Sequence, residues 1–381
     1  MSRSTGRLVA WAFVLVGFGL FLAGCGGSEG EGDFGDWTME EGSLRLTEDL
    51  RLSETANFYF GSVTALDVTP NGRMIVADEE AHNIKVLEPD GTLLDTLGRE
   101  GQGPGEFRGF HSLQVARGDS VFVLDRQQSR LTVYGPDSPY RFARTVTISR
   151  EDARIGQVYV LGGTLVGAQS TGIRQPEEGV LQPDPAHWVH LSETGVPGDT
   201  LFKTRWWPPY GLVKENGGIS FDAVPFARQA HTAVGPDRRT YTGWPDSLHV
   251  TATDPTGETE VVVSISAPAI PVQEADIDSA LSGTGAKLRG VIEPAIPATK
   301  PAFTDLLVAE DGRIWVKRPP EHPGADPVDW WVLGPETKTI RAVRLPREVE
   351  LHVVRNGFAY GKTTTDVGAP AVVRYRIGEE G

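Results

Sequence analysis

One stretch near the start of the chain constrains the fold more than any other. Residues Val63–Phe110 contain four short apolar or β-branched runs, which predict four strands: Val63–Val68, Arg73–Asp78, Asn83–Glu88 and Thr92–Leu97. Asn71-Gly72 and Asp90-Gly91 stand between runs, where tight hairpins need a positive φ. A four-stranded meander of about 40 residues cannot bury both of its faces alone, so the pattern predicts a repeat.

The same pattern recurs along the chain and predicts the architecture. Later units are marked by Gly118-Asp119, Pro236-Asp237, Asp311-Gly312 and Asn356-Gly357 turns, and a weaker third unit begins near Gln157. Six units predict an all-β fold, a six-bladed β-propeller of four-stranded antiparallel blades over residues 43–378. The sixth unit lacks its outer strand. Leu44–Leu52 alternates well enough to supply it from the N-terminal side, which would close the ring and remove a free sheet edge.

Four long connections interrupt the regular pattern. In a meander, second-to-third links and blade-to-blade links share one face, and the enlarged segments fall on those links: Thr171–His187, Arg205–Ala227, Pro268–Pro301 and Arg318–Asp329. Within the third of these, residues 271–300 predict a Pro-rich helical insertion between blades four and five, with a helix over Gln273–Val291. We expect the binding face to be this one, although long surface loops are also tolerated without a function.

The N-terminal residues predict export. Arg3 and Arg7 precede an apolar run from Leu8 to Gly24, so residues 1–24 match a secretory signal. Leu22-Ala23-Gly24-Cys25 resembles a bacterial lipobox, which implies a diacylglycerol on Cys25 and attachment to a membrane of the cell envelope. An ordinary signal peptide is the alternative. Residues 25–42 then form the lipidated cysteine and a flexible acidic tether, and Gly26, in place of an aspartate, favours the outer membrane over the inner.

Two further features resemble a known group. VTPNGRMIVADEEAHNIKVLEPDG followed by GREGQGPGEF at Gly98–Phe107 resembles the NHL-type repeats of six-bladed propellers. Together with the lipobox, the N-terminal closing strand and DGRIWV at Asp311–Val316, this is similar to exported bacterial six-bladed β-propeller lipoproteins. The resemblance implies the fold, while most known members of the group lack an assigned activity.

Charge and cysteine content narrow the choice of partners. The formal net charge is −15, and Arg3 and Arg7 would leave with the signal. Nucleic acid and anionic lipid surfaces need clustered Lys and Arg, so neither is expected as a partner. Cys25 is the single cysteine, so no intramolecular disulfide can form, and the fold must depend on its core.

RWWPPY at Arg205–Tyr210 is the first candidate site. Arg205, Trp206, Trp207 and Tyr210 place an arginine and three aromatic side chains in one connection, which favours recognition of a protein, peptide or glycan. The alternative is that the tryptophans pack on a neighbouring blade or plug the channel.

A metal site at the channel mouth is the second candidate. His111 and His231 each stand three or four residues before an inner-strand valine that aligns with Val68 of the first repeat. Asp305 stands at the matching place in blade five. Imidazole suits zinc and carboxylate oxygen suits calcium, so the three side chains could hold Zn or Ca if they converge. The alternative is a set of hydrogen-bonded structural side chains, for which no cofactor is expected.

The sequence therefore predicts a lipid-anchored cell-envelope propeller that binds or scaffolds a protein, peptide or glycan through its loop-rich face. The competing function is a metal-dependent, lactonase-like hydrolase or lyase with its site at the channel mouth.

Overall fold

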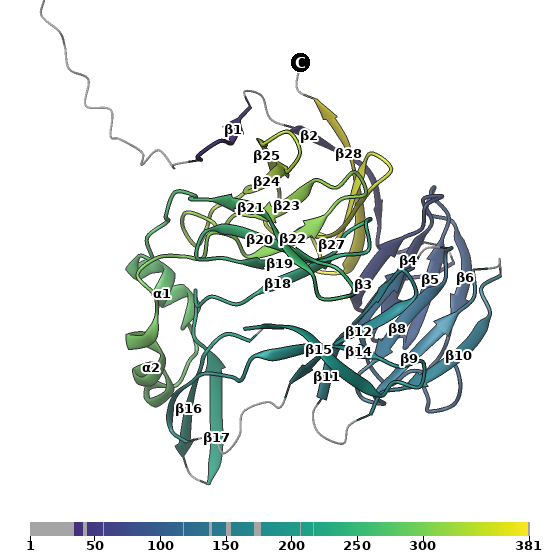
Figure 1. Ribbon diagram of the computed structural model, residues 1–381, viewed down its shortest axis with the longest axis horizontal. Helices are drawn as coiled ribbons and strands as arrows, with labels where there is room; N and C mark the ends of the chain where they lie inside the picture. The colour runs from purple at the N-terminus through teal and green to yellow at the C-terminus, as the bar shows by residue number, and fades with distance from the viewer. Residues whose placement is uncertain are drawn as a thin grey trace, which may run out of the picture. The chain divides into compact units, whose positions relative to one another are not determined.

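The computed structural model describes residues 34–40, 44–55, 57–116, 118–136, 139–149, 154–170, 177–205, 207–215 and 217–379. The signal segment and Cys25 lie outside the described residues. Six sheets that each contain four antiparallel strands confirm the six-bladed propeller. Figure 1 shows how their strands are arranged. No helix in the described part of the chain is both long and apolar enough to cross a membrane.

The first three blades have the strand order expected for a meander. With the inner strand first, they are β3 (Val63–Val68), β4 (Met74–Asp78), β5 (Asn83–Leu87) and β6 (Leu93–Leu97); β7 (Phe110–Val115), β8 (Val121–Asp125), β9 (Arg130–Tyr134) and β10 (Phe142–Thr147); and β11 (Arg154–Leu161), β12 (Thr164–Ser170), β14 (Ala186–Leu191) and β15 (Pro197–Thr204).

Blades four to six repeat this order. They are β18 (His231–Val234), β19 (Thr240–Trp244), β20 (Leu248–Thr253) and β21 (Thr259–Ile265); β22 (Asp305–Val308), β23 (Ile314–Lys317), β24 (Val328–Gly334) and β25 (Thr339–Leu345); and β26 (Glu350–Arg355), β27 (Phe358–Thr364), β28 (Pro370–Glu379) and β2 (Leu44–Leu52). A two-residue strand, β1 (Thr38–Met39), adds to blade five by pairing in parallel with β25.

The N-terminal strand closes the ring as the sequence predicted. β2 pairs with β28 in antiparallel register from Leu44 opposite Glu379 to Leu52 opposite Val372. Leu44 is buried in the core cluster between blades five and six, and Leu50 and Leu52 pack on the cluster between blades six and one. Both ends of the described propeller are thereby joined in one sheet.

Side chains of the inner strands tie each of the first three blades to the next. They stand at one equivalent position, immediately before the valine that aligns with Val68 in each repeat. Asp67 accepts a hydrogen bond from the Val115 N–H at 2.6 Å. Gln114 accepts from the Val160 N–H at 2.8 Å and donates to the Val160 carbonyl at 3.1 Å, and Tyr159 donates to the Thr232 carbonyl at 2.9 Å. In blades four to six this position holds Ala233, Leu307 and Val353, which pack in apolar clusters instead. At this one position, polar contacts join the first three blades to the next blade, and apolar packing takes their place in the other three.

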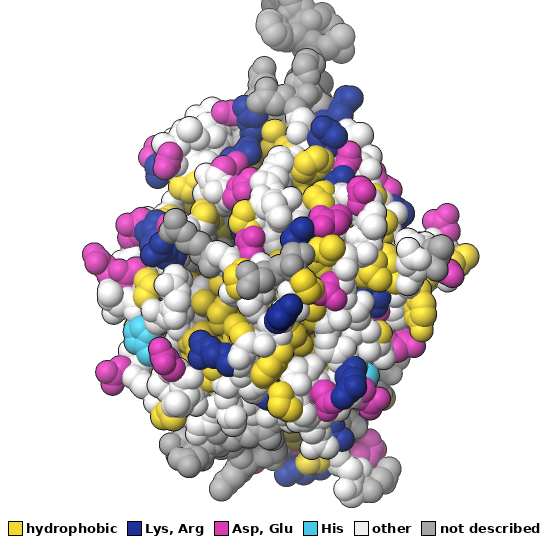
Figure 2. Space-filling model, turned by 90° about the vertical axis from the view of Figure 1, so that its right-hand side faces the viewer, with side chains coloured by type: hydrophobic (Ala, Val, Ile, Leu, Met, Phe, Trp, Pro, Cys, Tyr) yellow, Lys and Arg dark blue, Asp and Glu magenta, His cyan; other side chains and the backbone are white. Residues whose placement is uncertain are grey.

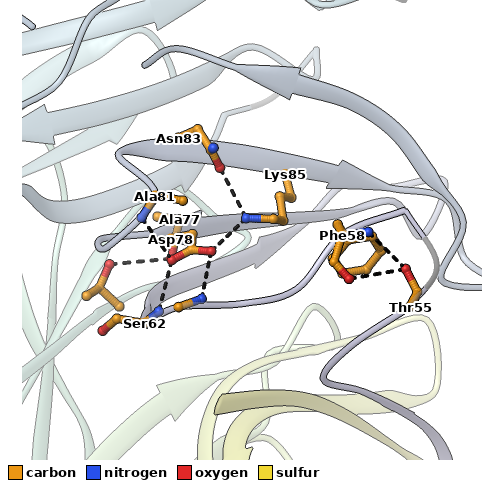
Figure 3. A network of polar contacts seen from close by, with 10 residues as sticks. Thr55, Phe58, Ser62, Ala77, Asp78, Ala81, Asn83 and Lys85 are labelled. Atoms are coloured by element: carbon orange, nitrogen blue, oxygen red, sulfur yellow. Dashed lines mark hydrogen bonds and ion pairs between the residues drawn. The ribbon is translucent and has the colours of Figure 1, made fainter. Parts of the chain in front are cut away.

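Asp78 ends β4 and fixes the segment that enters blade one. Its carboxylate accepts hydrogen bonds from the N–H groups of Gly61 and Ser62 at 3.0 and 2.9 Å, and from Lys85 Nζ at 2.6 Å (Figure 3). Burial alone would raise the pKa of the Asp78 carboxyl, but Lys85 and the two amides outweigh burial and hold the pKa below its ordinary value of 3.8. Both side chains are almost completely buried, so this is a buried ion pair rather than a surface one.

The long connections are more ordered than the sequence indicated. We expected one helix over Gln273–Val291, but two short helices form, α1 (Glu274–Ala280) and α2 (Ala286–Ile292), followed by the 3₁₀ turn η1 (Glu293–Ala295). Gly283 lies in the turn between the two helices, two residues beyond the C-cap Leu281, and its φ of 84° is a left-handed conformation that suits glycine. A separate three-stranded sheet also forms, which the sequence analysis missed: β13 (Gly179–Leu181), β16 (Tyr210–Glu215) and β17 (Gly218–Ala223).

Figure 2 shows the side of the molecule that lies at the right of Figure 1, where β6 and β10, the outer strands of blades one and two, are found. Acidic and basic side chains are interspersed with apolar ones across this side. The excess of acidic residues in the chain therefore does not form one continuous negative patch on this side.

Candidate functional site

The four enlarged connections come together and build one surface, as their placement in the meander predicted. β13, from the second-to-third link of blade three, pairs with β16, from the link between blades three and four. Helix α2, from the link between blades four and five, packs against this sheet through Leu288 and Ile292, which join Val213 and Val224 in one apolar cluster. We call the sheet β13–β16–β17 together with α1 and α2 the platform; it lies at the lower left of Figure 1.

A buried lysine joins the base of the platform to blade five. Lys300 Nζ donates hydrogen bonds to Asp276 of α1 at 2.7 Å and to the carbonyls of Pro320 and Glu321 at 2.8 and 3.0 Å. The Lys300 and Asp276 side chains are only 1% and 3% exposed. A buried charge is stable only with such a full set of partners, so these contacts fix the helices on the Arg318–Asp329 loop.

Two arginines add to this attachment. Arg228 donates to the Thr299 carbonyl at 2.6 Å and to the Thr299 hydroxyl at 2.8 Å, and it pairs with Asp246. Arg318 donates to the carbonyls of Ala302 and Pro268, and its guanidinium lies 4.5 Å from the ring centre of Trp331. The platform is therefore held by charged hydrogen bonds to backbone carbonyls and is not a set of loose loops.

The described residues of RWWPPY lie at the edge of the platform, and Arg205, Trp207 and Tyr210 line neither of the two cavities described below. The Arg205 guanidinium lies 5.9 Å from the ring centre of Trp244. Trp206 lies outside the described residues, and Trp207 is 37% exposed. Tyr210 begins β16, and its ring meets that of Phe221 edge-on at 6.3 Å.

Sequence reasoning missed the two most exposed apolar side chains of the platform. Ile219 and Phe221 on β17 are 56% and 65% exposed. The signal was available, because Asn216-Gly217 between apolar runs is a strong indicator of a hairpin. Alternation in Gly218–Ala223 then places Ile219 and Phe221 on one face, beside Tyr210.

The second candidate site concerns the central channel. A cavity of about 720 Å³ is lined by the inner strands of all six blades, and both His111 and Asp305 line it. His231 is not among its lining residues and packs instead against Phe303, with ring centres 5.5 Å apart. The structure thus brings two of the three proposed ligands to the channel and places the third in the wall.

A neighbouring cation and the number of available ligands disfavour the proposed metal, although the two imidazoles are neutral. Burial lowers the pKa of His231 to about 4, and burial with the charge of Arg126 lowers that of His111 to about 4, so at pH 7 both rings are in the neutral form that can bind a metal. Burial raises the pKa of Asp305 to about 6. Arg126 Nη1 lies 3.4 Å from His111 Nδ1, so a cation already occupies the side of that ring. Within the residues that the structure describes, no group of three or more His, Asp, Glu or Cys side chains could hold a metal ion.

The channel also contains polar atoms that have no role in the ties between blades. His352 Nε2 is buried without a hydrogen bond and lies 3.6 Å from Glu350 Oε1. Burial lowers the pKa of His352 to about 4, so its ring is neutral at pH 7. The lining of the channel thus combines neutral imidazoles with the charged side chains of Glu310, Glu350, Arg238 and Arg355.

Comparison with known proteins supports the architecture. A family model for a six-bladed β-propeller, DUF5128, matches residues 45–155. A Bacteroides fragilis protein that is thought to be exported is 14% identical, with a TM-score of 0.54 over 89% of this chain and 98% of its own. A DUF4221 family member from Bacteroides vulgatus is 10% identical, with a TM-score of 0.50 over 90% of this chain and 100% of its own. No curated protein matches the sequence.

At these identities the likeness shows the fold alone. The six-bladed propeller is confirmed, while the NHL type of its repeats and the lipid anchor stay predictions.

Proposed function

We propose that this protein is a lipid-anchored propeller of the cell envelope that binds a protein or peptide partner through its platform. The observation that carries the proposal is the exposed apolar side of β17, held on a support fixed by Lys300 and by the cluster around Ile292. Exposed apolar side chains on a rigid support are typical of interaction surfaces. Ile219 and Phe221 have no polar group for sugar hydroxyls, so the surface favours a polypeptide over a glycan.

Attachment through Cys25 would keep this surface outside the cytoplasm, with the outer membrane favoured. Roughly 0.8 kcal/mol for each buried CH₂ makes several acyl chains a lasting anchor. The Cys25→Ser variant should therefore move from the membrane fraction to the soluble fraction on cell fractionation, while Gly26→Ala stays with the membrane. Retention of Cys25→Ser in the membrane fraction would contradict the lipid anchor.

The binding surface can be tested in intact cells with a photo-crosslinking phenylalanine analogue. Placed at Phe221, it should give a defined crosslinked adduct, because this side chain would lie in the interface. Val261 on β21 is the matched control, since it is 58% exposed but lies outside the platform. No adduct at position 221, or the same adducts at both positions, would overturn the proposed function.

A further inference from the structure

The outer edge of β17 is a free sheet edge. β16 and β17 form a hairpin in which Glu215 pairs with Gly218, leaving a two-residue turn. The residues that close such a turn exchange both backbone hydrogen bonds, and bonded residues then alternate along the strand. The backbone groups of Ser220 and Asp222 therefore face β16, and those of Ile219 and Phe221 point away from it. No strand in the described part of the chain pairs with this edge, because β17 ends the order β13–β16–β17.

The two faces of this strand differ in chemistry. Ile219 and Phe221 lie on one face, opposite Lys214 and Leu212 of β16, and present apolar surface. Ser220 and Asp222 lie on the other, toward a cavity of about 540 Å³ between the sheet and the α1–α2 connection.

The lining of that cavity contains more acidic than basic side chains. Asp222 and Glu215 both line it. Lys287 also lines it, but its Nζ is bound to Glu178 at 2.8 Å and to the Lys214 carbonyl at 2.7 Å. The cavity therefore complements a basic side chain, and the other face complements an apolar one.

We infer that β17 binds an extended polypeptide segment as an added strand, with apolar residues beside Ile219 and Phe221 and basic residues beside Ser220 and Asp222. The inference rests on the proposed function and names the partner chemistry for the same platform. Main-chain hydrogen bonds to the outward groups of Ile219 and Phe221 would supply affinity, and the two faces would select alternating side chains. A second copy of this chain is disfavoured as the occupant, because each copy has a formal charge of −15.

Labelled hexapeptides and the detergent-solubilised full-length protein provide the test, with fluorescence anisotropy as the readout. An alternating Val–Lys peptide should bind at least tenfold more tightly than an alternating Val–Glu peptide or a Val₃Lys₃ block of the same composition. Equal binding of the three peptides would overturn the inference.

Two substitutions at one residue separate the backbone contribution from the side chain. Ile219→Pro removes an outward N–H without breaking a bond to β16, so the Val–Lys affinity should fall about tenfold or more. Ile219→Ala keeps the N–H and should lose clearly less, while Asp222→Asn should weaken binding and reduce its salt dependence. Equal losses for Ile219→Pro and Ile219→Ala, with thermal unfolding unchanged, would overturn strand addition.

The outcomes also distinguish this inference from the proposed function. A partner crosslinked at position 221 whose binding is unaffected by Ile219→Pro would overturn strand addition and leave the function in place. A dimer of the wild-type protein that dissociates in Ile219→Pro would show that a second copy occupies the edge, and would overturn the inference of a basic peptide.

Discussion

Replacing Asp78 with asparagine should lower the free energy of unfolding by about 3–5 kcal/mol, the range expected when one partner of a buried ion pair is removed. The substitution leaves the Lys85 ammonium buried, since this side chain is only 6% exposed and its ion-pair partner is Asp78. An asparagine amide nitrogen also cannot accept the hydrogen bonds that Gly61 or Lys85 donate. Chemical denaturation followed by tryptophan fluorescence measures the loss.

Asp125 provides the matched control for this prediction. It ends β8 as Asp78 ends β4, and it accepts hydrogen bonds from the Arg108 N–H at 2.8 Å and from the Gln128 side chain at 2.7 Å. Its partners are amide groups, so Asp125→Asn should cost about 1–3 kcal/mol, the range for a hydrogen bond to a charged group. Equal losses for the two variants would show that the charge of Lys85 is not responsible.

The effect of Asp78 should depend on pH in a defined direction. Its pKa is lower in the folded protein than its ordinary value of 3.8, so the folded state binds this proton less tightly than the unfolded state. The contribution of the carboxylate is therefore complete above the unfolded pKa and is lost as pH falls through the folded pKa. The stability difference between wild type and Asp78→Asn should stay constant at neutral pH and shrink below about pH 4. A difference that does not change down to acid unfolding would contradict this assignment.

These carboxylates illustrate what the sequence can and cannot predict. Asp78 and Asp125 end the second strands of successive repeats, and the turn glycines Gly72, Gly118, Gly312 and Gly357 have the positive φ that the turn sequences indicated. Local turn chemistry and period-two patterns are short-range features, so six blades and the closing strand could be predicted. Lys85 could not be assigned as the partner of Asp78, because nothing in its own neighbourhood of the sequence distinguishes it from a surface lysine.

The platform shows the same limit at a larger scale. β13 is three residues long and pairs with residues more than 28 positions further along the chain, so its existence depends on a contact that no local pattern encodes. Lys300 is a single lysine in a Pro-rich segment, and its acceptors come from α1 and from the Arg318–Asp329 loop. The prediction that these segments share a face follows from strand topology alone, and the structure confirms it. The side chains that make the surface specific could be identified only from the tertiary structure.

The topology also explains why the loop-rich face can carry a rigid surface. Each blade contributes links to this side, so an enlarged link can be fixed by links from neighbouring blades without altering any strand of the ring. Arg228 and Lys300 fix neighbouring connections to one another in this way: Arg228 donates to Thr299, and Lys300 donates to Pro320. The platform can therefore change in sequence while the propeller that supports it stays the same.

A chain that begins at Ser53, and so lacks β2, should not fold into a stable monomer. β2 supplies the buried Leu44 and the partly buried Leu46, Leu50 and Leu52, and Asp49 pairs with Arg374 and Arg376 of β28. Burying one leucine contributes about 1.5–3 kcal/mol, so losing this strand removes on the order of 5 kcal/mol, comparable with the whole stability of a typical domain. Its absence also leaves β28 as an unpaired edge, which favours association with other chains. Size-exclusion chromatography with light scattering should show aggregates or exchanged oligomers in place of a monomer.

A chain that begins at Glu41 is the control, because it lacks β1 and Trp37 but keeps β2. It should remain folded with reduced stability, since Trp37 is buried against blades four and five and only two residues of β1 pair with β25. Adding a synthetic peptide of residues Leu44–Leu52 to the chain that begins at Ser53 should restore a cooperative unfolding transition, because the missing strand would then pair with β28 from outside. A monomeric, cooperatively folded protein without either β2 or the peptide would show that β26–β28 form a sufficient sixth blade, and that closure by the N-terminal strand is not what stabilises the ring.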